Sequence, residues 1–178
     1  MLEATELEEV VRIEHEKWMK EAIKEALLAR EKEEVPIGAI IVKDDQIIAR
    51  GHNVRELERD ALGHAELRAI QAANNEFDAW RLEGTTMYVT LEPCPMCAGA
   101  LINSRVERVV YGASDLKAGC AGTLMNLLED PRFNHQTETI RGVLAEECGM
   151  LLTEFFKVLR EHKKNRKLST GSVYNLRK

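Results

Sequence analysis

The sequence predicts one α/β domain with helices on both faces of a sheet. The chain has 178 residues, of which 44% are hydrophobic and 31% charged, and this composition is typical of a globular domain with a substantial core. Segments with helical spacing of apolar residues alternate with short β-branched segments, which is the pattern of an α/β fold. We find no internal repeat, so we expect a single domain over residues 1–178 with a basic and mobile tail from about 161 to 178.

The first elements expected along the chain are one long helix and a hairpin. Thr5-x-x-Glu8 resembles a capping box, and the apolar residues that follow have helical spacing, so residues 5–30 are predicted to be an amphipathic helix. Residues 35–42 are rich in β-branched side chains and predict a strand. Asp44-Asp45 then forms a turn into a second strand over residues 46–50.

The rest of the chain is expected to alternate between helices and strands. In chain order we predict a helix over residues 64–73, a strand over 86–91, a helix over 96–102, a strand over 106–111, a short helix near 124–128, a strand over 137–142 and a final helix from about Glu146 into the basic tail. Pro93 and Pro95 end the strand that precedes them, because proline cannot donate to a strand ladder.

The composition excludes several broad classes of protein. No stretch approaches the roughly 20 apolar residues of a membrane-spanning helix, and the acidic residues 1–9 lack the basic-then-apolar order of a secretion signal. We therefore expect a cytoplasmic protein with no membrane partner. Four cysteines without an export signal do not indicate a disulfide framework, and we expect Cys120 and Cys148 to be buried packing residues.

Charge is distributed unevenly along the chain. The net charge of −5 gives no reason to expect a general affinity for nucleic acid, but residues 157–167 are strongly basic, whereas the first 34 residues are rich in glutamate. Such an asymmetry can mark a local phosphate-binding surface. A solvated C-terminal helix explains the same charges equally well.

The most informative feature is a pair of short motifs about thirty residues apart. His64-Ala65-Glu66 is followed by Pro93-Cys94-Pro95-Met96-Cys97. One imidazole and two thiolates are zinc ligands, and a set of three leaves the fourth position for water, as in catalytic sites. Zinc lowers the pKa of that water toward 7, and Glu66 is placed to carry its proton. The combination H-x-E with P-C-x-x-C is the signature of zinc nucleobase deaminases.

Two other interpretations of these cysteines remain open. Cys94 and Cys97 form a CxxC pair, which also occurs at thioredoxin-like redox sites, although such a site does not require a His-x-Glu upstream. A structural zinc site would need a fourth protein ligand, for which Cys120 and His52 are the candidates.

Further segments extend the pattern beyond the two motifs. They are Val35-Pro36-Ile37-Gly38, Gly51-His52-Asn53, Tyr88-Val89-Thr90-Leu91-Glu92 leading into Pro93, Ala98-Gly99, Arg108-Val109-Val110-Tyr111-Gly112-Ala113, Phe133-Asn134-His135 and Phe155-Phe156. With these segments the chain closely resembles the bacterial tRNA adenosine deaminases of the cytidine deaminase superfamily, from about Trp18 to Arg160. The first motifs are shared widely among purine and pyrimidine deaminases, whereas the last two point to the tRNA enzymes.

The resemblance implies a fold, a reaction and an assembly. The expected fold is three-layer α/β/α and cytidine deaminase-like, with a mixed five-stranded central sheet. The expected reaction is hydrolytic deamination of adenosine to inosine at wobble position 34 of an arginine tRNA anticodon, with release of ammonia. One Zn²⁺ per subunit would carry the hydroxide that attacks C6. The expected assembly is a homodimer whose active site receives residues from both subunits.

The resemblance also implies roles for particular residues. His64, Cys94 and Cys97 match the zinc ligands, and Glu66 matches the proton shuttle. Asn53 matches the asparagine that hydrogen-bonds the target base, a task suited to an amide that both donates and accepts. Residues beside the flipped base or its neighbouring nucleotides are matched by Val35, Pro36 and Asp115.

An RNA loop is a suitable substrate because C6 of adenine is inaccessible within a stacked helix, so the base must be extruded. Phe155 and Phe156 could supply apolar surface for loop bases while the basic tail meets phosphates, or they could pack inward as core residues.

Two rival functions remain. One is a deaminase of free guanine, cytosine or nucleotides. The other is a zinc-stabilised tRNA-binding module without turnover, which has no need of Glu66.

Overall fold

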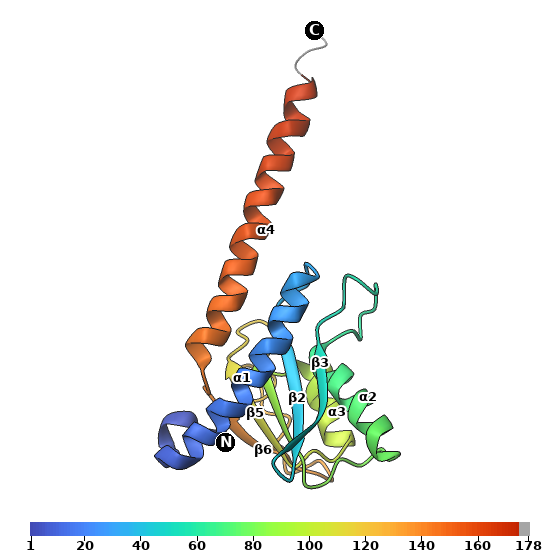
Figure 1. Ribbon diagram of the computed structural model, residues 1–178, viewed down its shortest axis with the longest axis vertical. Coiled ribbons are helices and arrows are strands. Elements are labelled where there is room, and N and C mark those ends of the chain that lie inside the picture. The colour runs from blue at the N-terminus through green and yellow to red at the C-terminus, as the bar shows by residue number, and fades with distance from the viewer. Residues whose placement is uncertain (175–178) are drawn as a thin grey trace.

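A mixed sheet of six strands lies between two layers of helices, as Figure 1 shows. The computed structural model describes the backbone of residues 1–174 and the side chains of residues 1–165. The elements are, in order, β1 (Leu2–Glu3), the 3₁₀ helix η1 (Ala4–Glu6), α1 (Glu9–Glu31), β2 (Gly38–Lys43), β3 (Gln46–His52), α2 (Ala65–Phe77), β4 (Thr86–Leu91), α3 (Pro95–Asn103), β5 (Arg108–Ala113), β6 (Glu138–Arg141) and α4 (Ala145–Tyr174).

The strand order across the sheet is β1-β6-β5-β4-β2-β3. The hairpin of β2 and β3 is antiparallel, and β2 also runs antiparallel to β4. The strands from β4 to β1 are parallel to one another. Because parallel strands end at the same edge of a sheet, the segments that follow β4 and β5 meet there, and ligand sites of α/β sheets commonly form at this edge.

Alternating residues of the strands serve two separate cores. In β2, Ala39 and Ile41 join the core beneath α2 and α3. Ile40 and Val42 face the opposite side and join the core beneath α1 and the start of α4. A sheet that is buried on both faces is the three-layer arrangement expected from the sequence.

Two glycines bring the helices close to the hairpin. A Cβ atom at Gly38 would collide with the α1 backbone at Ala22, and one at Gly51 would collide with the α2 backbone at Ala65. Glycine permits this close approach because it has no side chain. The contact at Gly51 sets the start of α2 directly against the strand that leads to Asn53.

The sequence interpretation needs three corrections. The sixth strand is β1, a two-residue strand that pairs with β6 and is too short to give a pattern. The expected capping box at Thr5 is wrong, because the structure forms it between Glu3 and Glu6 on η1, and α1 begins only at Glu9. The short helix expected near residues 124–128 is absent from the described structure, which has turns and an isolated bridge between Ala121 and Asn126 there.

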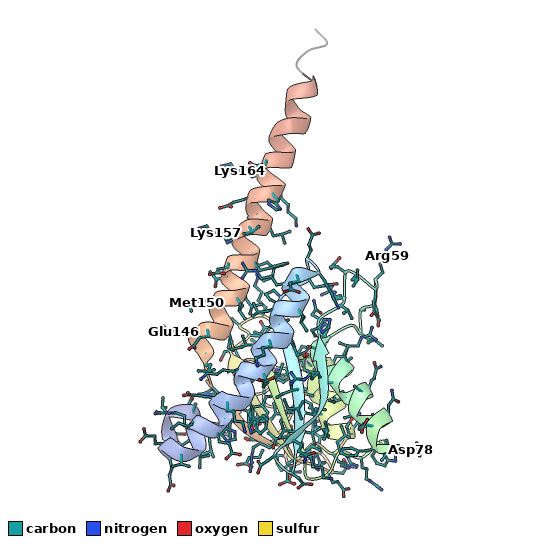
Figure 2. All side chains as sticks on the ribbon, viewed as in Figure 1. Arg59, Asp78, Glu146, Met150, Lys157 and Lys164 are labelled. Carbon is teal, nitrogen blue, oxygen red and sulfur yellow. The ribbon has the colours of Figure 1, made fainter. Side chains whose placement is uncertain are left out.

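The last helix, α4, leaves the body of the molecule (Figure 1). Cys148 near its start is buried, whereas residues 160–165 are all exposed. Figure 2 shows Lys164 on the projecting part. The predicted tail from 161 therefore begins within a helix that runs to Tyr174, and residues 175–178 lie outside the described residues. Over the part of the chain that the structure describes, no helix has the length and apolar character of a membrane span.

Candidate active site

Three side chains from two helix starts form a group that could hold a metal ion. His64 is the N-cap residue of α2, Cys94 is the N-cap residue of α3, and Cys97 lies in the first turn of α3. The His64 Nδ1 lies 3.7 Å from the Cys94 Sγ and 3.5 Å from the Cys97 Sγ. All three ligand atoms lie within 4.8 Å of one another.

Local sequence explains why the two cysteines face the histidine. Pro95 occupies the first position of α3, where its missing N–H costs nothing and its fixed φ favours the helix. The helix then turns Cys97 back beside Cys94. A helix N-terminus carries partial positive charge, which favours thiolate over thiol.

Hydrogen bonds within the metal-ligand group and burial shift the pKa values of all three side chains. Hydrogen bonds from Cys97 and His64 lower the pKa of Cys94 to about 4, against the opposing effect of burial. The hydrogen bond with Cys94 raises the pKa of His64. It also raises the pKa of Cys97, and burial adds to this. Imidazole nitrogen and thiolate sulfur together are a donor set that fits a borderline-soft divalent ion such as Zn²⁺.

Glu66 lies in the first turn of α2, two residues after His64. Its side chain is only 4% exposed, and burial, the largest cause, raises the pKa of its carboxyl to about 6. A carboxyl group with a pKa near neutrality can both accept and release a proton at physiological pH. This is the property that a proton shuttle needs.

A cavity of about 510 Å³ opens beside the metal-ligand group. The predicted site residues on its walls are Val35, Asn53, His64, Glu66, Cys94, Asp115 and Phe156. The structure thus brings together residues from the end of α1, the ends of β3 and β5, two helix starts and α4. Cys97 is fully buried, and Pro36 is buried next to Val35.

The two phenylalanines of α4 point to different places. Phe156 is 40% exposed and lines the cavity. Phe155 lines a separate groove of about 300 Å³ between α4 and the end of α1, which also includes Arg30. The rings meet edge to face at 5.5 Å. Only Phe156 therefore lies on the wall expected for substrate.

The segment Phe133-Asn134-His135 does not reach this cavity within the same chain. His135 Nε2 hydrogen-bonds the carbonyl oxygen of Val106 at 2.8 Å. Val106 precedes β5, whereas the cavity lies beyond its carboxyl end at Asp115.

Two buried carboxylates beside the cavity were not recognised in the sequence. Glu34 accepts a hydrogen bond from Asn53 Nδ2 at 3.0 Å. Glu92 accepts backbone hydrogen bonds from Asp115 and Ala121 at 3.0 Å each, and it also binds the backbone and hydroxyl of Thr123. Glu92 lies in the quoted run before Pro93, whereas Glu34 stands at the end of the glutamate-rich first 34 residues.

The structure also bears on a closed, four-ligand metal site. His52 hydrogen-bonds Glu25 at 3.2 Å and Lys32 at 2.8 Å. Cys120 is buried, and its backbone N–H binds the carbonyl oxygen of Pro93. Among the described side chains, neither belongs to the metal-ligand group, which contains only His64, Cys94 and Cys97. All four cysteines are free.

Comparisons with known proteins agree with this geometry. Residues 13–160 match the family model described as MafB19-like deaminase. The chain is 61% identical over 149 residues to a tRNA-specific adenosine deaminase of Bacillus subtilis, and the match covers 84% of this chain and 92% of the relative. This chain belongs to the tRNA-specific adenosine deaminase family. A family member from Haemophilus influenzae is 43% identical, with 89% of this chain and 92% of that protein covered.

Solved structures give the same result for the fold. A structure from a study of A-to-I editing by tRNA:A34 deaminases has a TM-score of 0.73 and 38% identity, covering 76% of this chain and 99% of the other. A guanine deaminase from Bacillus subtilis has a TM-score of 0.56 and 31% identity, covering 83% of this chain and 94% of the other. The family fold is therefore cytidine deaminase-like, with six strands here instead of the expected five.

Proposed function

We propose that this protein hydrolytically deaminates adenosine to inosine at wobble position 34 of a tRNA, with an arginine tRNA as the substrate that the resemblance implies. One observation carries the proposal. The three-residue metal-ligand group, the buried Glu66 and the amide of Asn53 line or adjoin a single cavity. The chain that builds this cavity is 61% identical to a tRNA-specific adenosine deaminase.

His64, Cys94 and Cys97 would hold one zinc ion per subunit. A zinc ion held there would supply a Lewis acid that activates water as the nucleophile for C6 of adenine. The Glu66 carboxylate takes a proton from the water and passes it to the ring nitrogen beside C6. It then delivers the second water proton to the departing amine, so that ammonia leaves and the carbonyl of inosine forms.

The remaining cavity residues would hold the target base and its neighbours. Asn53 presents an amide that can donate and accept hydrogen bonds at the purine edge. Val35 would provide apolar surface beside the flipped base, with the buried Pro36 next to it in the chain. Asp115 and Phe156 on the cavity walls, and Phe155 in its separate groove, would contact the neighbouring nucleotides.

An RNA loop fits the shape of the molecule better than a free base. Phe156 of α4 lines the cavity and is 40% exposed, and the same helix carries Lys157, Arg160, Lys163 and Lys164 as exposed residues. Lysine and arginine on one helix can neutralise phosphates. An anticodon base is already unpaired, so its extrusion costs less than extrusion from a duplex.

The proposal extends to the assembly and the location of the enzyme. A homodimer is supported by Phe133-Asn134-His135, a segment typical of the tRNA enzymes that lies away from the cavity of its own chain. In a dimer it would be available to the partner's site.

A tRNA substrate supports a cytoplasmic location. A single deaminase domain over the whole chain is supported by the continuous sheet and its two cores.

A second candidate function is deamination of free guanine. The relative with a TM-score of 0.56 favours it, because that protein is a guanine deaminase of the same fold. Free guanine has no phosphates for the projecting basic helix α4 to bind, which is why we place this candidate second.

The decisive experiment compares RNA and free bases directly. The purified protein is incubated with an arginine tRNA anticodon stem-loop that contains A34, and in parallel with adenosine, guanine and cytidine. We expect inosine only in the stem-loop, as measured by nucleoside chromatography after digestion. Release of xanthine from guanine, with no inosine in the RNA, would establish the second candidate instead.

Two controls define the reaction in that experiment. A stem-loop with G34 keeps the RNA but removes the reactive adenosine, and it should give no inosine. Glu66→Gln should keep zinc and RNA binding while turnover falls by about 1,000-fold or more, since general acid–base catalysis contributes about 10²–10⁴-fold. Turnover near that of the unsubstituted protein would disprove the proton-transfer role of Glu66.

A further inference from the structure

Glu34 is a buried acidic residue that the proposed mechanism does not use. It follows the C-terminal end of α1, where Glu33 adopts the left-handed backbone conformation with φ 61°, and its N–H binds the carbonyl oxygen of Ala29. Its side chain is 1% exposed. Acidic side chains are almost never fully buried unless their oxygens are paired.

Both carboxylate oxygens of Glu34 are used. Oε2 accepts a hydrogen bond from Asn53 Nδ2 at 3.0 Å, and Oε1 accepts one from the backbone N–H of Leu57 at 2.5 Å. These bonds join the end of α1 to the segment that follows β3. An ionised carboxylate can only accept hydrogen bonds, so the Asn53 amide must turn its NH₂ group toward Glu34.

The orientation of the amide determines what Asn53 offers to a ligand. With one N–H committed to Glu34, the Oδ1 acceptor and the second N–H are left. Asn53 lines the cavity, and the hydrogen bonds found among the described residues give its Oδ1 no partner. An asparagine without such a neighbour could flip and exchange its donor and acceptor.

We propose that Glu34 is a positioning residue that locks the Asn53 amide in one orientation, so that an acceptor and one donor face the target base. This inference rests on the proposed function for its link to catalysis. The Leu57 N–H makes the orientation of Asn53 depend on which atoms the side chain at position 34 carries, and not only on its volume. It holds Oε1 of Glu34 as an acceptor, so the other oxygen of that carboxylate always faces Asn53.

The isosteric change Glu34→Gln exploits this arrangement. The oxygen of the introduced side-chain amide would stay on the Leu57 N–H, and the NH₂ group of that amide would then oppose the NH₂ group of Asn53. Asn53 must flip or lose its partner, although the side-chain volume is almost unchanged. Glu25→Gln is the matched control, because Glu25 is also buried on α1 but binds Arg50 and His52 away from the cavity.

Turnover of the A34 stem-loop provides the first test. We expect Glu34→Gln to lower kcat/KM by about 10- to 100-fold, the scale of a buried polar group left unpaired, with zinc content unchanged and Glu25→Gln near the unsubstituted value. In an Asn53→Ala background, adding Glu34→Gln should change kcat/KM by less than about 3-fold, because the interaction is already gone. A small effect of Glu34→Gln alone, or an equal loss in the Asn53→Ala background, would overturn the inference.

A second measurement does not depend on turnover. The side-chain amide of Asn53 gives a pair of ¹⁵N–¹H signals, assigned by their absence in Asn53→Ala. We expect Glu34→Gln to shift these signals and speed their exchange with water, while Glu25→Gln leaves them in place. Unchanged signals in Glu34→Gln would contradict the lock. If the unsubstituted protein fails to deaminate the stem-loop, the proposed function fails, and the amide signals still test the contact.

Discussion

The metal-ligand group and the walls of the same cavity differ in how far apart their residues lie along the chain. His64 lies at the start of α2, and Cys94 and Cys97 lie at the start of α3. Only β4 and its connections separate these two helices. The walls instead come from the end of α1, the end of β3, the end of β5 and α4, which are spread over most of the chain.

The metal-ligand group is positioned by local sequence motifs, whereas the cavity walls are positioned by contacts between distant segments. The metal-ligand group needs two helix starts on one face of the sheet, and local motifs specify those starts. The walls need four segments to be held at fixed positions by contacts between them. Buried carboxylates provide those contacts, since Glu34 joins α1 to Asn53 and Glu92 joins the end of β4 to the loop of Asp115. We therefore expect changes at the two regions to have different effects.

The largest effect is expected for Cys97→Ala. Removing one of three ligands should lower the zinc content from about one ion per chain to near zero and abolish deamination, as measured by metal analysis and turnover. Cys148→Ala is the matched control, because Cys148 is equally buried but packs in the opposite core. It should keep its zinc. Full zinc content in both Cys97→Ala and Cys94→Ala would show that the ligand assignment is wrong.

A smaller effect, confined to the walls, is expected for Glu92→Gln. The carboxylate accepts backbone hydrogen bonds from Asp115, Ala121 and Thr123, and glutamine replaces one acceptor with a donor. The free energy of unfolding should fall by about 1–3 kcal/mol, and the KM for the stem-loop should rise while zinc stays bound. Thermal unfolding and steady-state kinetics measure both effects.

An exposed carboxylate provides the comparison for Glu92. Glu138→Gln removes a surface ion pair with Arg108, and such pairs contribute about 0–1 kcal/mol. It should leave both measurements nearly unchanged. Loss of zinc in Glu92→Gln would contradict the comparison, because zinc binding would then depend on the contacts that hold the cavity walls.

The smallest effect is expected from shortening α4 after Arg160. This removes the exposed Lys163 and Lys164 together with the rest of the basic tail, and Figure 2 shows Lys164 on the part of α4 that projects beyond the body. RNA binding should weaken and its dependence on salt should flatten by about one unit of slope per lost phosphate contact. Turnover at saturating RNA should persist. An unchanged slope in binding titrations would identify this end of α4 as a solvated helix.

Much of the fold could be predicted from the sequence, because its strands and helices have strong local patterns. The strand over residues 86–91 was predicted with the bounds that β4 has, and the helix predicted over residues 96–102 lies within α3, which begins at Pro95. The sixth strand, β1, could not be predicted, because two residues carry no periodicity and form a strand only by pairing with β6. The turns after residue 121 are held largely by Glu92, a contact from a distant strand end.

The candidate site follows the same division. The three metal ligands and Glu66 could be named from two short motifs, since each motif lies at the start of one helix. Asn53 and the wall residues required the resemblance. Glu34 was missed because its neighbours Glu31 and Glu33 are exposed, and only the turn at the end of α1 directs it inward. Phe155 and Phe156 are adjacent on α4, yet Phe156 lines the cavity and Phe155 lines the separate groove.

The position of the metal-ligand group between two helices has a consequence for the folding equilibrium. An ion bound to His64 and both cysteines would join α2 to α3 as a cross-link, closing a loop of about thirty residues. Closure of such a loop reduces the entropy of the unfolded chain by an amount worth about 3–4 kcal/mol, by analogy with a disulfide. All four cysteines are free, so a reversible, chelator-sensitive link would take the place of a covalent one.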